Sequence, residues 1–159
     1  MAAYTDSHGF NKGSAAGHPA KGLTRVGYME VDLDFAKITT ARAAAGATAL
    51  AAGDSIEVLS IPANTLVLAV GATTITAEGA ASTFDIGLTG GDVDGFVDGG
   101  DANAAGTTQS NGALLIANNN GHYFATADTI DMLIGVSGAV TDAARIKVWA
   151  VIVDCSTVA

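Results

Sequence analysis

Apolar and polar residues alternate strictly in the stretch YMEVDLDF, residues 28–35. Met29, Val31, Leu33 and Phe35 occupy one face, while a tyrosine and three acidic residues occupy the other. An alternation with a period of two residues is typical of a strand that buries one face and exposes the other. The stretch therefore predicts a half-buried β-strand.

The same period returns along the rest of the chain, between clusters of Gly, Asn, Asp and Ser that favour turns. We expect further strands at residues 55–61, 66–76, 82–88, 113–117, 122–127, 129–136 and 145–155. Pro62 and the following Ala-Asn-Thr separate the first two of these, which favours either a hairpin or a corner. The chain thus predicts about eight strands.

Alanine dominates TTARAAAGATALAAGD, residues 39–54. Alanine favours a helix, but Gly46 and Gly53 weaken it, so a short helix and a small-residue loop both fit. Nothing in the sequence predicts long amphipathic helices that would cover a parallel sheet. The predicted fold is all-β, an antiparallel β-sandwich, and an eight-stranded jelly roll fits the strand count.

The last predicted strand, residues 145–155, is apolar on both faces over its second half. Trp149, Val151 and Val153 share the face opposite the regular apolar series. A strand of this kind needs cover on both sides. Either a neighbouring subunit or the domain's own loops could supply it, and we take these three residues as candidates for a subunit contact.

Length and composition predict a single domain with an extended arm. The chain has 159 residues, enough for one core, and 49% of them are apolar. No uninterrupted apolar run approaches the ~18 residues of a membrane-spanning helix, so we expect no membrane partner. Residues 1–26 show no apolar periodicity and predict an extended N-terminal arm, without the apolar segment of a secretory signal. Residues 27–159 predict the β-sandwich domain.

Charge is divided between the arm and the domain. The net charge is -9, and no lysine or arginine occurs between Arg42 and Arg145. An acidic domain repels phosphate backbones, so we expect no nucleic-acid partner. Lys12, Lys21 and Arg25 make the arm basic, which suits contact with an acidic partner surface. A tail without function is the alternative.

The stretch GLTGGDVDGFVDGGDANAAG, residues 87–106, concentrates acidic residues, namely Asp92, Asp94, Asp98 and Asp101. A calcium loop of the EF-hand type needs an oxygen ligand at position 5 and a glutamate at position 12. Counted from Asp92, these positions hold Phe96 and Asn103. The stretch therefore predicts a solvated connection anchored by Phe96 or Val97, with an irregular cation site as the weaker alternative. We expect no metal site.

Catalytic constellations are absent from the sequence. The three histidines show no metal-ligand spacing, and neither a GxSxG motif nor a glycine-rich loop with lysine occurs. The single cysteine, Cys155, excludes an internal disulfide framework and predicts a small buried residue near the end of a strand. We expect neither an enzyme nor a cofactor.

The order of motifs over residues 50–155 resembles small structural proteins of tailed bacteriophages. In AAGDSIEVLSIPANTLVLAVGATTITAEGAASTFDIGL, a Gly-Asp turn, a strand, an Ile-Pro-Ala corner, two strands and an Asp-Ile-Gly exit follow one another. YFATADTIDMLIGV and a hydrophobic terminal strand come later. The resemblance implies a jelly-roll-like capsid decoration (cement) protein, made in the host cytoplasm. It further implies a homotrimer on the outer surface of an icosahedral head, with the major capsid protein as partner.

Similar β-rich phage proteins serve as head fibres or tail-tip components, so a module that binds a host-surface carbohydrate is the alternative. Carbohydrate sites usually present exposed tryptophan or tyrosine rings. The one tryptophan of this chain, Trp149, lies within its most apolar strand. This position favours the structural role.

Overall fold

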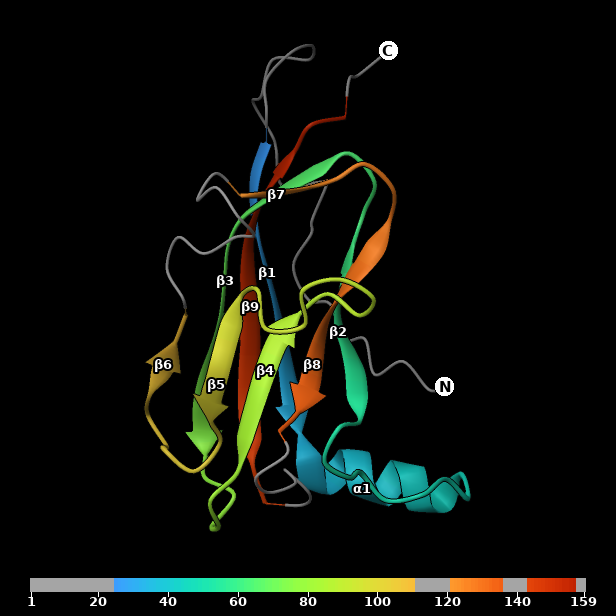
Figure 1. Cartoon of the computed structure of the whole chain (residues 1–159), viewed down its shortest axis with the longest axis vertical. Coiled ribbons are helices and arrows are strands. Elements are labelled where there is room, and N and C mark those ends of the chain that lie inside the picture. The colour runs from blue at the N-terminus through green and yellow to red at the C-terminus, as the bar shows by residue number, and fades with distance from the viewer. Residues whose placement is uncertain (1–24, 111–120, 136–142, 157–159) are drawn as a thin grey trace.

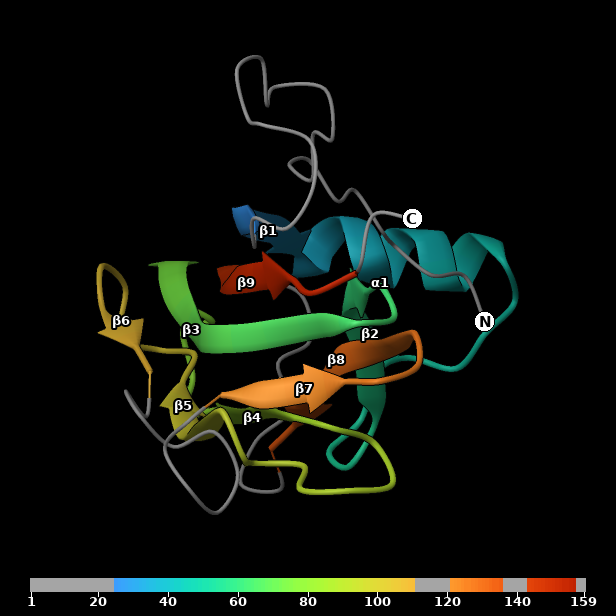
Figure 2. The same cartoon turned by 90° about the horizontal axis from the view of Figure 1, so that it is seen from above.

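The computed structural model describes residues 25–110, 121–135 and 143–156. Two antiparallel sheets face each other and form a sandwich, with one short helix at its end (Figures 1 and 2). The elements are β1 (Arg25–Asp34), α1 (Phe35–Ala44), β2 (Ser55–Ile61), β3 (Thr65–Thr76), β4 (Thr83–Gly87), β5 (Val97–Asp101), β6 (Thr108–Gln109), β7 (His122–Phe124), β8 (Asp128–Ile134) and β9 (Arg145–Asp154).

The strand order is that of a jelly roll. One sheet runs β1-β9-β3 and continues with β6 and β7, which both pair with β3, while the other runs β2-β8-β4-β5. Since β6 and β7 share one edge of β3, they act as two pieces of a single strand, and the sandwich then has the eight strands of this fold. The predicted fold class is confirmed. The segment between β2 and β3 is a corner, because these strands belong to different sheets.

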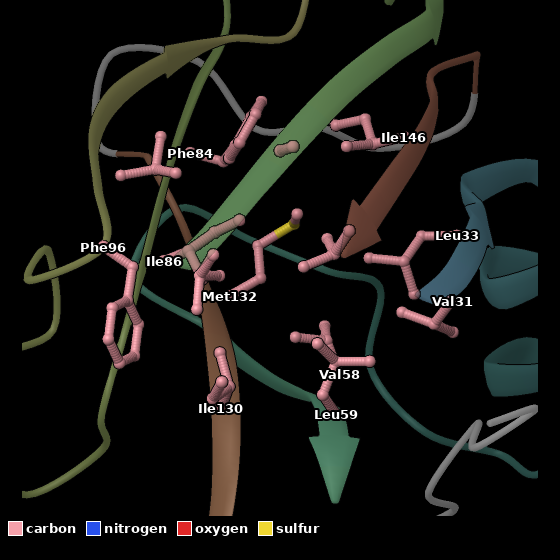
Figure 3. Close-up of a cluster of buried hydrophobic side chains, with 14 of the residues drawn as sticks. Val31, Leu33, Val58, Leu59, Phe84, Ile86, Phe96, Ile130, Met132 and Ile146 are labelled. Atoms are coloured by element: carbon pink, nitrogen blue, oxygen red, sulfur yellow. The ribbon is translucent and has the colours of Figure 1, made fainter. Parts of the chain in front are cut away.

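The inward faces of both sheets form one hydrophobic core (Figure 3). Leu33 of β1 and Ile146 of β9 come from one sheet, and Phe84 of β4 and Met132 of β8 come from the other; all four are fully buried. The alternation in β1 and β9 places every second side chain in this core. The remaining residues of β1 and β9, both polar and apolar, lie on the outer face of the sheet.

The alanine-rich stretch forms a helix, α1, in its first part only. Asp34 caps its first turn by accepting a hydrogen bond from the backbone N–H of Lys37 at 3.1 Å. Gly46, with φ of 68°, ends it, and the N–H of Ala47 donates to the carbonyl of Arg42 at 2.9 Å. This is the Schellman arrangement, in which a left-handed glycine satisfies the last carbonyls. Gly46 is therefore the residue that stops the helix.

The predicted strands at residues 28–35, 55–61, 66–76, 82–88, 122–127, 129–136 and 145–155 all correspond to strands of the structure, with shifted ends. The largest shifts are at residues 28–35, where β1 begins three residues earlier, and at residues 122–127, where β7 covers only His122–Phe124. The predicted strand at 113–117 lies outside the described residues. None of the helices in the described part of the chain is long and apolar enough to cross a membrane.

The expectation of an uninterrupted loop from 87 to 106 is wrong. Residues 97–101 form β5, which pairs with β4. The pairing brings the backbone of Gly100 under the ring of Phe84, because a Cβ at Gly100 would lie 2.5 Å from that ring. The anchoring prediction is confirmed, since Phe96 and Val97 are both buried.

Candidate interaction surface

A row of apolar side chains crosses the outer face of the β1-β9-β3-β7 sheet. Val26 lies opposite Val153, Val153 opposite Leu66, and Leu66 opposite Tyr123. Residues directly opposite each other in antiparallel strands share one face, so the four side chains stand side by side. Val26 is 70% exposed and Tyr123 49% exposed at the ends of the row. We call this row and its continuation at Tyr28, Val151 and Trp149 the outer apolar face.

The continuation lies on the same face, two and four residues further along β9 from Val153. Tyr28 is opposite Val151, and Trp149 is opposite Gly71. A Cβ at Gly71 would lie only 2.4 Å from Cζ2 of Trp149, so the indole ring covers the glycine. Glycine has no side chain to pack in a strand, and an aromatic neighbour across the strand fills that place. Trp149 is thereby half-buried against its own sheet.

Charged pairs border the outer apolar face on the side toward α1. Lys147 donates from Nζ to Oε1 of Glu30 at 3.1 Å, and the Tyr28 hydroxyl donates to Oε2 of Glu30 at 2.9 Å. The hydrogen bond from Lys147, followed by that from Tyr28, lowers the pKa of Glu30. Burial, together with this bond to Glu30, raises the pKa of Tyr28. These bonds fix the tyrosine ring at the boundary between apolar and charged halves.

A second ion pair joins β1 and β9 further along. Nε of Arg145 donates to Oδ1 of Asp32 at 2.9 Å, and this contact raises the pKa of Arg145. Asp32 also lies opposite Lys147 in the strand register. The outer face of the sheet is thus divided into an apolar part near Arg25 and a paired, charged part near α1.

The predicted contact residues differ from one another in burial and in whether the structure describes them. Trp149 and Val151 are half-buried and Val153 is buried on the outer apolar face. They belong to a strand that runs between β1 and β3, so part of their cover comes from neighbouring strands. Of the predicted arm residues, Lys12 and Lys21 lie outside the described part. The backbone of Arg25 begins β1, opposite Asp154.

The four aspartates of the acidic stretch are divided between two elements. Asp92 and Asp94 lie in the turn before β5, and a hydrogen bond between their carboxyl groups raises the pKa of Asp92. Asp98 and Asp101 lie on β5 itself, where Asp101 accepts from the backbone N–H of Asn103 at 2.7 Å. Within residues 25–110, 121–135 and 143–156, no group of three or more His, Cys, Asp or Glu side chains is arranged to hold a metal.

Two other residues considered for chemistry have structural surroundings. The ring of His122 packs edge-on against Phe124, with centroids 4.7 Å apart. The prediction that Cys155 is buried is wrong: it follows the end of β9 and is exposed. Its backbone N–H donates to the carbonyl of Asn64 at 2.8 Å, which holds the chain against the β2–β3 corner but leaves the thiol outside.

Sequence reasoning missed four of the seven residues of the outer apolar face. Val26, Tyr28, Leu66 and Tyr123 join it only through strand pairings between segments far apart in the chain. The alternation in residues 28–35 did place Tyr28 on the polar face of its strand. An aromatic residue at the head of an otherwise acidic face was the signal that could have identified it.

No protein-family model and no curated protein matches the sequence. The structure is similar to solved chains of two phage capsids. A chain of the cyanophage Pam1 capsid asymmetric unit matches with a TM-score of 0.51 and 14% identity, over 88% of this chain and 91% of that chain. A chain of the capsid of Ralstonia phage GP4 matches with a TM-score of 0.50 and 16% identity, over the same shares. At this identity the likeness establishes a shared fold.

Proposed function

We propose that the protein is a structural component of a phage virion, a capsid decoration protein. In this role it binds the outer surface of an icosahedral head and bridges neighbouring capsid subunits. The observation that carries the proposal is the fold: the jelly roll matches chains of two phage capsids over nearly the whole length of both partners. The resemblance of the sequence of residues 50–155 to phage structural proteins supports the proposal independently of the structural match.

The outer apolar face supplies the contact between copies in this proposal. We assign it to the contact between copies because Val26, Tyr28 and Tyr123 are each about half exposed or more on one face, and the resemblance to phage decoration proteins suggests three copies. Burying an exposed valine or tyrosine contributes on the order of 1–2 kcal/mol. Several such residues from each copy, joined around a closed symmetry axis, would hold three subunits together.

Cementing then follows from mass action. A protein that binds assembled capsid subunits and not dissociated ones shifts the equilibrium toward the assembled shell. The major capsid protein is the proposed partner, and the basic arm with Lys12 and Lys21 would reach toward an acidic surface on it. The proposed site of action is the outside of the virion, where no chemistry is required of the bound protein.

The test is sedimentation of the purified protein with phage heads stripped of their outer proteins. We expect saturable binding with a fixed number of copies per head, and heads that survive heating at a higher temperature once decorated. Absence of binding to the heads, with the protein in a folded state, would refute the proposal.

The trimer is tested separately by light scattering. We expect three copies for the unmodified protein and a monomer for Val26→Lys, because a charge on the most exposed residue of the outer apolar face opposes its burial. Val93→Lys is the matched control, since Val93 is an exposed valine on the other sheet's loop. A concentration-independent monomer for the unmodified protein would rule the trimer out.

A second candidate is a module that binds host-surface carbohydrate. The specific observation in its favour is the exposure of Tyr28 and Tyr123, 48% and 49%, on the same face. Aromatic rings of this kind can stack on sugar rings. Binding of host cell-wall polysaccharide that is lost in Tyr123→Ala, without binding to heads, would favour this function over decoration.

A further inference from the structure

Asp131 is a buried carboxylate with one unpartnered oxygen. It lies on the outer side of β8, beneath the loop that joins β4 to β5, and is only 6% exposed. Its Oδ2 accepts a hydrogen bond from the backbone N–H of Thr89 at 3.0 Å. Its Oδ1 is buried and has no hydrogen-bond partner among the described residues. A buried carboxylate oxygen without a donor or a cation is costly.

A cavity of about 10 Å³ adjoins this carboxylate. Its lining residues are Ser55, Gly87, Leu88, Thr89, Val93, Asp131 and Leu133. Such a volume holds one small species and no more. Ser55 and Thr89 are among the lining residues, and their hydroxyls lie 3.1 Å from each other, so side chains with oxygen atoms adjoin the cavity besides Asp131.

The overlying loop is held tightly on the sheet. A Cβ at Gly87 would lie 2.1 Å from the carbonyl oxygen of Asp92, so only glycine permits this approach. The N–H of Leu88 donates to the same carbonyl at 2.8 Å. Backbone that the fold fixes in place therefore lines part of the cavity, and the exposed residues Ser55, Thr89 and Val93 line the rest of its opening.

The strands of the sheet that carries the cavity contain acidic residues and no basic ones. Glu57 lies directly opposite Asp131 in the β2–β8 pairing, and like charges in that position repel. Residues 43–144, which include every strand of this sheet, contain no lysine or arginine. The strands of this sheet therefore supply no lysine or arginine to balance the charge of Asp131, and a cation from solution could balance it.

We propose that this cavity binds a single hard cation, Ca²⁺ or Na⁺, through Oδ1 of Asp131 and neighbouring oxygen atoms. Hard cations of this kind prefer carboxylate, hydroxyl and carbonyl oxygens. With a single carboxylate in the cavity, the affinity for Ca²⁺ falls in the weak, about millimolar, range. The site is distinct from the Asp92–Asp94 pair, and it does not depend on the proposed function.

The test is thermal unfolding of the full chain at constant ionic strength. The reference salt is tetramethylammonium chloride, whose cation is too large for the cavity, and NaCl or CaCl₂ replaces it stepwise. We expect a saturable rise of about 5 °C in the melting temperature with one of the two metal ions. Comparison of the NaCl titration with the CaCl₂ titration identifies the ion. In parallel, the amide resonance of Thr89 should shift with the same half-saturation concentration.

Asp131→Asn is the decisive variant, because it keeps the shape and an acceptor for Thr89 but removes the charge. We expect it to abolish both the rise and the resonance shift. Asp94→Asn removes one charge from the same loop without touching the cavity, and should respond as the unmodified protein does. Ser55→Ala should raise the half-saturation concentration several-fold, and it provides the test if Asp131→Asn does not fold.

Two outcomes would overturn the proposal. Equal melting temperatures in all three salts would mean that no cation from solution occupies the cavity. A response lost in Asp94→Asn and kept in Asp131→Asn would place the cation at the exposed Asp92–Asp94 pair.

Discussion

At the scale of single residues, Gly71 and Trp149 form the most constrained pair on the outer face. Replacing Gly71 by alanine should lower the free energy of unfolding by about 1–3 kcal/mol, since the new Cβ collides with the indole ring and approaches the carbonyl of Gln109. Urea denaturation measures the loss. Gly91→Ala is the control, because its Cβ would lie an ordinary 3.5 Å from Leu88. Equal losses for both variants would mean that the indole does not press on Gly71.

Glu30 gives the surface a pH dependence. Its folded pKa is below the usual value of 4.5, chiefly because of Lys147, so its contribution to stability is present above that value. The contribution is lost as the pH falls through the folded pKa. We expect the difference in unfolding free energy between the unmodified protein and Glu30→Gln to shrink on acidification below about pH 4.5. A difference that stays constant down to pH 2 would contradict this assignment.

At the scale of elements, we expect the cap at Asp34 to contribute to the stability of α1. Asp34→Ala should lower the melting temperature, because the N–H of Lys37 loses its acceptor. Asp34→Asn should restore most of this, since an asparagine oxygen can serve the same role. Thermal unfolding followed by circular dichroism compares the three proteins. A loss in Asp34→Asn as large as in Asp34→Ala would point instead to the ion pair with Lys37.

The elements that the sequence predicted are those whose own residues carry the pattern. β1 and β9 alternate over most of their ten residues, and their inward faces follow directly, whereas a bulge in β2 buries both Val58 and Leu59. β6 has only two residues, both polar, and β5 reads VDGGD. Such strands exist because a partner strand offers hydrogen bonds, and that information is not local. The same reason explains why Asp131 could not be singled out: its burial depends on a loop folding over β8.

At the scale of the whole molecule, the arm and the domain should be separable. The core is formed by residues from Met29 to Ile152, so deleting residues 1–22 should leave the melting temperature nearly unchanged. Binding to stripped heads should weaken, because Lys12 and Lys21 are removed with the arm. Exchange of Lys12, Lys21 and Arg25 for alanine should weaken binding less than deletion and make the rest less sensitive to salt. Equal affinity of truncated and full-length protein would assign attachment to the domain alone.

The pairing of β1 with β9 has a topological consequence. Arg25 and Asp154 lie directly opposite each other, so their Cα atoms are about 5 Å apart. A short glycine linker could therefore join residue 156 to residue 25 without disturbing either sheet. The exposed turn at Ala80 and Ala81, between β3 and β4, offers a place for new ends. A circular permutant opened there should keep the jelly roll. A protein fused to its new ends would lie at the end of the sandwich far from the row formed by Val26, Val153, Leu66 and Tyr123.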